Sequence, residues 1–339
     1  MSALLEARGL KKHFLLARKS LFAPRLKLHA VDGVDLRINP GEAVGLVGES
    51  GCGKSTLARL ICRLLDPNAG EVRLEGQNIS TIPASRFARS PHRRMIQMVF
   101  QDPTESLNPR FSAFDLIADP IRQLMPRAHR ADLCASVERA ATEVNLPLSL
   151  LDRFPHQLSV GQKARVGIAR AIAVQPKLLV LDEPTSALDV SVQATVLQLL
   201  DRLRRDHGIA LFFVSHDLNV VRLLCDRVLV MYLGQVVESG PAAEIYANPT
   251  HPYTQALLSA IPTLRDRKGA RIRLDGEPQS PVNPAPDRCR LVGRCPVEQP
   301  ECLIRAPELR RLSDRRQSRC HFATLTPDRQ RTAADAGAD

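Results

Sequence analysis

The chain has no tryptophan and only three tyrosines among its 339 residues. Proteins that bind single-stranded nucleic acid stack bases on aromatic side chains, so this scarcity argues against a nucleic-acid platform. The net charge of +11 and the pI of about 9.6 suggest an anionic partner such as a nucleotide or an anionic lipid. Because the arginines are scattered, a solvated basic surface is the simplest interpretation of most of this charge.

Long apolar runs and an export signal are also missing. No apolar run approaches the eighteen residues of a membrane-spanning helix, and the first fourteen residues lack the basic-then-apolar order of a secretory signal. We therefore expect a cytosolic protein whose membrane role is peripheral. In that compartment the eight cysteines are expected to be thiols or metal ligands rather than disulfides.

The order of elements predicts an α/β fold. Short continuous apolar strands at 177–183 and 209–217 are typical of a parallel sheet that is covered on both faces. A helix is expected over 55–65, and mostly helical structure over 112–173. The chain carries no internal repeat and one set of nucleotide-binding motifs.

The stretch GESGCGKST at 48–56 follows an apolar strand and precedes a helix, which is the context that a phosphate-binding P-loop requires. Glycines let backbone N–H groups close around the phosphates, and the helix adds its positive end. Lys54 is expected to contact the outer phosphates, Ser55 to ligate Mg²⁺, and Thr56 to bond a phosphate. Cys52 is interpreted as a tolerated small residue. The residues expected to bind ATP here are Gly48, Ser50, Gly51, Cys52, Gly53, Lys54, Ser55 and Thr56.

Two carboxylates follow the buried strand LLVL at 178–181, at the end where α/β sheets bind ligands. Asp182 is expected to hold Mg²⁺ through a water molecule or through one of the ion's direct ligands. Glu183 is the expected general base that polarises the attacking water.

SVGQKARVGIARAI at 159–172, after PHQL, resembles the signature motif of ATP-binding cassette (ABC) ATPases. Gln101 matches that family's Q-loop, 186–189 its D-loop, and His216 its switch histidine. The resemblance covers about residues 4–262. It implies a RecA-like α/β core with an antiparallel β subdomain and an inserted helical subdomain at about 105–173.

The resemblance also implies roles for residues. His216 would contact the γ-phosphate beside Glu183, and Gln101 would touch Mg²⁺ or water, completing a set with Ser55 and Asp182. Phe14 either stacks on adenine, as an aromatic does in this family, or is an ordinary strand residue.

Two cassettes would face each other, so that the signature of one contacts ATP held by the other. The signature residues are Ser159, Val160, Gly161 and Gln162. Val160 departs from the family's usual Ser-Gly-Gly-Gln, and a β-branched side chain at this position is expected to weaken the shared site.

Residues 182–193, 100–110 and 251–262 look like the ATPases of oligopeptide, dipeptide and nickel importers. This resemblance implies a peripheral location on the cytoplasmic face of the inner membrane, two permease subunits and an extracytoplasmic solute-binding protein. The insert at 15–28 resembles one of two paired ATPase subunits, which favours a heterodimer with a sister ATPase and leaves a homodimer open. The transported solute stays open.

The chain after 262 is proline-rich and loop-like, and it contains four cysteines with the spacing CxxxxxCPxxxxxC…CH. We expect an ATPase domain over 1–262, an extension over 263–325 and a disordered tail over 326–339. Cys289, Cys295, Cys302 and Cys320 suggest a metal that replaces a missing apolar core, with His321 as an alternative ligand. Spacing alone does not separate Zn²⁺ from a [4Fe–4S] cluster. The wide gaps and the resemblance to the importer subfamily both favour the cluster.

The function that these motifs favour is ATP hydrolysis that drives import of di- or oligopeptides or related small solutes. The alternative is a non-transport cassette ATPase that acts on nucleic acid or the ribosome. Such proteins carry long insertions or two cassettes, and this chain has neither, so no nucleic-acid partner is expected. A nucleotide-binding regulator without turnover is opposed by the presence of both Glu183 and His216.

Overall fold

The computed structural model describes residues 2–18, 24–126, 129–261, 272–277 and 279–325. It contains two sheets. The smaller is antiparallel, with strand order β2-β1-β4-β5. Its strands are β1 Leu5–Leu15, β2 Lys27–Ile38, β4 Ala69–Leu74 and β5 Gln77–Asn78.

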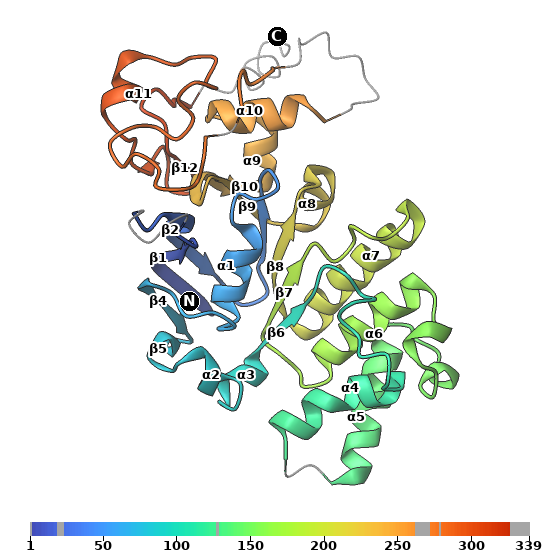
Figure 1. Cartoon of the computed structure of the whole chain (residues 1–339). Coiled ribbons are helices and arrows are strands. Elements are labelled where there is room, and N and C mark those ends of the chain that lie inside the picture. Colours follow the sequence, from blue (N-terminus) through green and yellow to red (C-terminus); the bar gives the residue numbers. More distant parts are fainter. Residues whose placement is uncertain (1, 19–23, 127–128, 262–271, 278, 326–339) are drawn as a thin grey trace, which may run out of the picture.

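The larger sheet has the order β11-β12-β10-β9-β3-β8-β7-β6, and its five strands from β9 to β6 are parallel. Its strands are β3 Ala43–Val47, β6 Ile96–Val99, β7 Leu178–Asp182, β8 Ala210–Ser215, β9 Arg227–Tyr232, β10 Gln235–Pro241, β11 Arg310–Arg311 and β12 Gln317–Ser318. Figure 1 shows this sheet between α1 with the small sheet on one side and α6 and α7 on the other.

The longer helices are α1 Lys54–Ile61, α4 Ala113–Leu124, α5 Arg130–Glu143, α6 Val160–Ile172, α7 Val190–His207 and α10 Pro252–Ser259. The shorter ones are α2 Ala84–Phe87, α3 His92–Met95, α8 Leu218–Leu224, α9 Ala242–Ala247 and α11 Pro300–Ile304, together with 3₁₀ turns at Ile79–Thr81, Leu148–Leu150 and Pro155–Gln157. The predicted α/β fold with an antiparallel subdomain and a helical insertion is confirmed.

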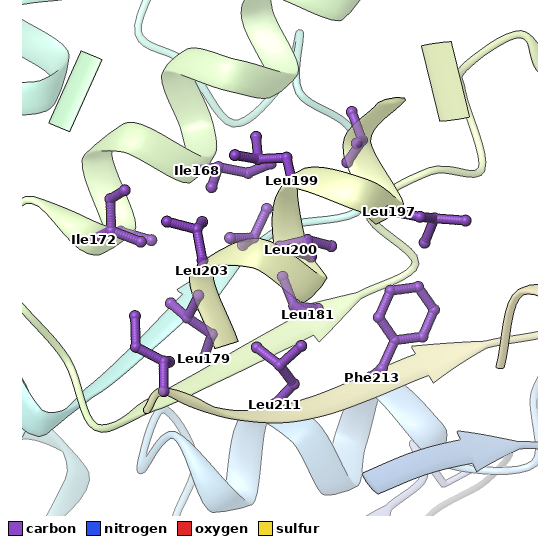
Figure 2. Close-up of a cluster of buried hydrophobic side chains, with 14 of the residues drawn as sticks. Ile168, Ile172, Leu179, Leu181, Leu197, Leu199, Leu200, Leu203, Leu211 and Phe213 are labelled. Carbon is purple, nitrogen blue, oxygen red and sulfur yellow. The ribbon is translucent and has the colours of Figure 1, made fainter. Parts of the chain in front are cut away.

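The buried central strands supply two cores because successive side chains of a strand point to opposite faces. Leu179, Leu181, Leu211 and Phe213 pack on one face with α6 and α7, as Figure 2 shows. Their sequence neighbours, such as Val180 and Phe212, pack on the other face with α1 and the small sheet. A continuous apolar strand is therefore what a sheet with two covered faces needs.

One boundary differs from the sequence prediction. The helix expected over 55–65 ends at Ile61. Arg63 has a left-handed backbone with φ of 53°, and its guanidinium is buried. It donates to the Ile82 carbonyl at 2.5 Å and to Asp66 at 2.7 Å, so contacts outside the helix turn the chain away.

The C-terminal extension joins the main sheet, because β12 pairs antiparallel with β10. In Figure 1 the extension, in orange and red, packs above β1 and β2. The predicted boundary at 262–263 and the predicted disordered tail over 326–339 lie outside the described residues, so the proposed division into domains stays a prediction.

Candidate functional site

The P-loop connects β3 to α1 and can be built only with glycine at two positions. A Cβ on Gly48 would lie 2.2 Å from the Met231 carbonyl oxygen, and one on Gly53 would lie 1.9 Å from the Ala30 carbonyl oxygen. Gly53 also has φ of 108°, a region that side chains rarely permit. The loop therefore lies against β2 and β9, with Ser50 and Gly51 exposed at its tip.

Lys54, Ser55 and Asp182 meet beside this loop. The buried Lys54 donates from Nζ to the carbonyl oxygens of Gly48 at 2.8 Å and Glu49 at 3.0 Å. Ser55 Oγ donates to Asp182 Oδ1 at 3.0 Å. Burial raises the pKa of Asp182, with the charge of Glu183 adding to the rise and the Ser55 hydrogen bond opposing it. Hydroxyl and carboxylate oxygens are the ligands that Mg²⁺ prefers, so this pair fits the ion.

Glu183, Gln101 and His216 form a second cluster at the same edge of the sheet. Gln101 Nε2 donates to Glu183 Oε2 at 3.2 Å, and His216 Nδ1 lies 3.1 Å from the same oxygen. A polar hollow of about 110 Å³ is lined by Glu183, His216 and residues of the D-loop. Glu183 has a left-handed φ of 47°, a conformation that is uncommon for a side chain and often occurs at functional sites.

Strand order explains why these residues meet. Lys54, His216 and Gln101 follow β3, β8 and β6, and Asp182 is the last residue of β7. These four strands are consecutive in the sheet and parallel. Their carboxyl ends share one edge, which is where open α/β sheets bind ligands.

Three other predicted ATP-binding residues lie around this edge. Cys52 is buried, and burial raises the pKa of its thiol to about 11, which fits a small packing residue. Thr56 is half-buried in the first turn of α1. Phe14 lies on β1, and its ring is half-buried. It pairs with Leu28 of β2, which is two residues before Ala30, the residue whose carbonyl lies against Gly53.

The signature residues form the start of α6. Ser159 caps the helix: its Oγ accepts from Gln162 N at 3.2 Å, and Gln162 Oε1 accepts from Ser159 N at 2.9 Å. Gly161 is needed for packing, since a Cβ there would lie 2.9 Å from Val192 of α7. Val160 is 43% exposed. Within the described ranges no hydrogen bond or ion pair joins these residues to the P-loop.

Sequence reasoning missed a contact between the P-loop and the C-terminal region. The backbone N–H of Glu49 donates to the Tyr253 hydroxyl at 2.9 Å. Arg294 donates to both carboxylate oxygens of Glu49, at 3.3 and 3.4 Å, and to the Tyr232 hydroxyl at 3.2 Å. The only sequence signal was that Arg294 precedes a singled-out cysteine, Cys295.

The four predicted cysteine ligands converge on one pocket, whose lining also includes His251 and His321. The Cys289 N–H donates to the Cys302 carbonyl at 2.9 Å. Burial raises the pKa of Cys289 to about 11 and also raises the pKa values of Cys295 and Cys320. Of the described residues, only His13, His29 and Asp32 place three potential metal-ligating atoms within 4.8 Å of one another, so no three of the four cysteine sulfurs meet that limit.

No helix among the described residues combines the length and apolarity needed to cross a bilayer.

The P-loop, the strand-end carboxylates and the parallel sheet define a P-loop ATPase. Residues 31–186 match the family model described as "ABC transporter", and residues 237–302 match "Oligopeptide/dipeptide transporter, C-terminal region". The chain belongs to the ABC transporter ATPases, in the group that carries this oligopeptide/dipeptide C-terminal region, and it is an ATPase.

The relatives and solved structures agree with this assignment. The chain is 46% identical to the oligopeptide transport ATP-binding protein OppF of Salmonella typhimurium, covering 90% of this chain and 92% of that protein. It is 44% identical to AppF of Bacillus subtilis, covering 94% and 97%. The dimeric cassette MJ0796 bound to ADP and Pi is 28% identical with a TM-score of 0.63, over 70% of this chain and 98% of that one. CbiO1 of Clostridium perfringens is 28% identical with a TM-score of 0.62, over 73% and 92%.

Proposed function

We propose that this chain hydrolyses ATP to energise an importer of di- or oligopeptides or related small solutes. It would act as a peripheral subunit at the cytoplasmic face of the inner membrane, with two permease subunits, a sister ATPase and, indirectly, an extracytoplasmic solute-binding protein. The observation that carries the proposal is the convergence of Lys54, Ser55, Asp182 and Glu183 in a chain whose C-terminal region matches the oligopeptide/dipeptide family.

The proposed chemistry follows from the positions of the side chains. Lys54 and the P-loop N–H groups bind the β- and γ-phosphates. Ser55, Gln101 and Asp182 would hold Mg²⁺, which neutralises charge on the transferred phosphate when bound. Glu183 takes the proton of the attacking water, since its carboxylate lies beside the hollow that His216 also lines.

His216 orients that water and contacts the γ-phosphate. Its Nδ1 lies 3.1 Å from Glu183 Oε2, so a proton on this nitrogen would hold the carboxylate in place while the other ring nitrogen stays available. Gln101, which donates to the same carboxylate oxygen at 3.2 Å, links the site to the segment that precedes the helical insertion.

Two cassettes would complete the site. The exposed start of α6 offers backbone N–H groups to the nucleotide of a facing subunit, because a helix N-terminus stabilises anionic charge. The insert at 15–28 favours a sister ATPase as this partner over a second copy. Phe14 would stack on adenine from the β1–β2 side of the P-loop.

We further propose a [4Fe–4S] cluster held by Cys289, Cys295, Cys302 and Cys320. A four-thiol donor set around one pocket fits such a group. A single tetrahedral Zn²⁺ with bonds of about 2.3 Å would hold its four sulfurs roughly 3.8 Å apart, whereas no three of these cysteine sulfurs all lie within 4.8 Å of one another. When bound, the cluster would supply a covalent staple to a loop-rich segment, and its assembly would release the protons of the four thiols.

Co-purification from detergent-solubilised membranes tests the transport assignment. Recovery of two multi-spanning permeases and a second ATPase with the tagged chain is the expected result. Ribosomes or DNA-repair factors in place of permeases would refute it and favour the non-transport alternative.

The hydrolytic assignment is tested separately by Glu183→Gln, which should trap ATP-bound dimers; unchanged turnover would refute the role of Glu183 as base. Iron and sulfide analysis of an anaerobic preparation tests the cluster, and absence of both would exclude it.

A further inference from the structure

A cavity of about 260 Å³ lies between the ATPase core and the C-terminal extension, away from the P-loop edge. Its walls come from β1, β2, β9 and β10 on one side and from residues 285, 286, 288–291, 306, 307 and 319 on the other. Figure 1 shows the orange and red extension packing above the blue strands. The cavity is large enough for a small anion or a phosphorylated metabolite, and its position means that a ligand would touch both parts of the chain.

Positive charge dominates the lining. Four basic side chains, Lys11, Arg288, Arg290 and Arg319, face the cavity, whereas Asp32 is the single carboxylate among its lining residues. A cavity with this balance attracts anions, and low-dielectric walls strengthen the attraction.

The Asp32 carboxylate already has a charged or hydrogen-bonding partner at both of its oxygens. It forms an ion pair with Arg290, and the ring nitrogens of His29 and His13 lie 3.2 and 3.3 Å from its two oxygens. Lys11 Nζ is 4.0 Å away. Burial raises the pKa of Asp32, but the hydrogen bond to His29 and the charge of Arg290 outweigh it, so that the pKa is lowered to about 2. This carboxylate therefore stays ionised and has no capacity to neutralise a further cation.

Arg319 and Arg288 have no ion-pair partner within the part of the chain that the structure describes. Arg319 donates from Nε to the Val236 carbonyl at 3.0 Å and from Nη1 to the Pro307 carbonyl at 3.4 Å, which are neutral acceptors. Arg319 is half-buried and Arg288 is exposed, so an anion in the cavity would neutralise the charges of two guanidinium groups that lack an ion-pair partner there.

We propose that this cavity binds a small phosphate-bearing anion, with Arg288, Arg290 and Arg319 as its ligands. Guanidinium groups match phosphate because their planar N–H forks donate two parallel hydrogen bonds to its oxygens. Since the ligands come from the extension and the other walls from the ATPase core, the bound anion fixes the extension on the core. The proposal is independent of the transport function, because it uses no residue of the ATP site.

Calorimetric titration with inorganic pyrophosphate tests this site in full-length protein carrying Lys54→Ala, which removes the competing phosphate site of the P-loop. The expected result is one saturable site whose affinity falls about tenfold for each arginine removed by Arg288→Gln and Arg319→Gln. Arg86→Gln with Arg89→Gln, two exposed arginines at and beside α2, is the matched control for the same loss of charge. This control should retain the affinity.

Three outcomes would overturn the proposal: no saturable binding in the Lys54→Ala protein, equal weakening in the cavity and control variants, or full affinity after both cavity substitutions. Folding is checked in protein that retains Lys54, where the cavity variant should bind ATP as the wild type does. Titration with inorganic phosphate and with a sugar phosphate then separates a site for free phosphate from one for a phosphorylated metabolite. Undiminished sugar-phosphate affinity in the cavity variant would also overturn the proposal.

Discussion

A buried ion pair attaches the C-terminal extension to the ATPase core. Arg316 Nη2 and Glu238 Oε1 are 2.9 Å apart, and the two side chains are 4% and 0% exposed. Glu238 also accepts from Thr250 N at 2.9 Å, Thr250 Oγ1 at 2.8 Å and His251 N at 3.0 Å. Arg316 precedes β12, and Glu238 lies on β10, to which β12 pairs. The pair therefore controls how firmly the last strands join the sheet.

We predict that Arg316→Met destabilises this junction by about 3 kcal/mol. Removing one partner of a buried pair costs roughly 3–5 kcal/mol because the other charge is left uncompensated. We use the lower end of this energy range because three hydrogen-bond donors of Thr250 and His251 still contact the Glu238 carboxylate. Methionine retains most of the apolar stem, which packs near Gly240, so the loss reports on charge rather than on volume. Local opening should become about 100-fold more frequent, at 1.4 kcal/mol for each factor of ten.

Hydrogen exchange measured by mass spectrometry on peptides that cover 314–321 gives this opening free energy directly, with peptides of β3 as the internal reference. An increase in exchange below about fivefold would refute the calculation. Glu238→Gln combined with Arg316→Met removes the uncompensated charge and should recover at least half of the loss. If the double variant is less protected than Arg316→Met alone, the single variant's loss arises from packing and not from charge.

Three further predictions concern other residues. Lys54→Ala should abolish ATP binding because Lys54 supplies the charge for the outer phosphates, and retained affinity in a nucleotide titration would discredit the site. Val160→Gly should leave unchanged or raise the ATPase rate of the assembled complex, since the exposed valine adds only bulk at the start of α6; a large loss of rate would mean that the valine is required. Burial lowers the pKa of His251 to about 4, with the charge of Glu238 opposing the shift. Below pH 6.5 this histidine is protonated in the unfolded chain, whereas in the folded chain it stays neutral until about pH 4. As the pH falls from 6.5 to 4, the free energy of unfolding therefore decreases by at most about 3 kcal/mol because of this residue. His251→Asn keeps a helix cap and should remove this part of the pH dependence in urea unfolding at pH 7 and pH 4.5, whereas an identical dependence in the variant would contradict the assignment.

Local patterns in the sequence determined the phosphate loop, the strand that carries Asp182 and Glu183, and the capped start of α6. Each depends on residues within about a dozen positions: glycines where the backbone must approach closely, apolar runs where both sheet faces are covered, and Ser159 with Gln162 at a helix start. Such features can be predicted from sequence because helix and strand propensity, helix capping and the alternation of apolar residues depend on neighbouring positions in the chain. The position of His216 beside Glu183 was predicted from resemblance rather than from spacing, and the contact of Gln101 with Glu183 was not predicted.

Tertiary structure alone decided how the C-terminal extension is used. Arg294 reaches Glu49 across 245 positions, Arg316 reaches Glu238 across 78, and the basic cavity exists only where two parts of the chain meet. No local pattern specifies which strand edge a loop-rich segment will join, because that choice depends on strand order and on buried charge pairs. The end of α1 at Ile61 has the same cause. Arg63 forms buried hydrogen bonds with acceptors outside the helix, and these outweigh the helix propensity of residues 55–65. The sequence of that segment alone does not specify those acceptors.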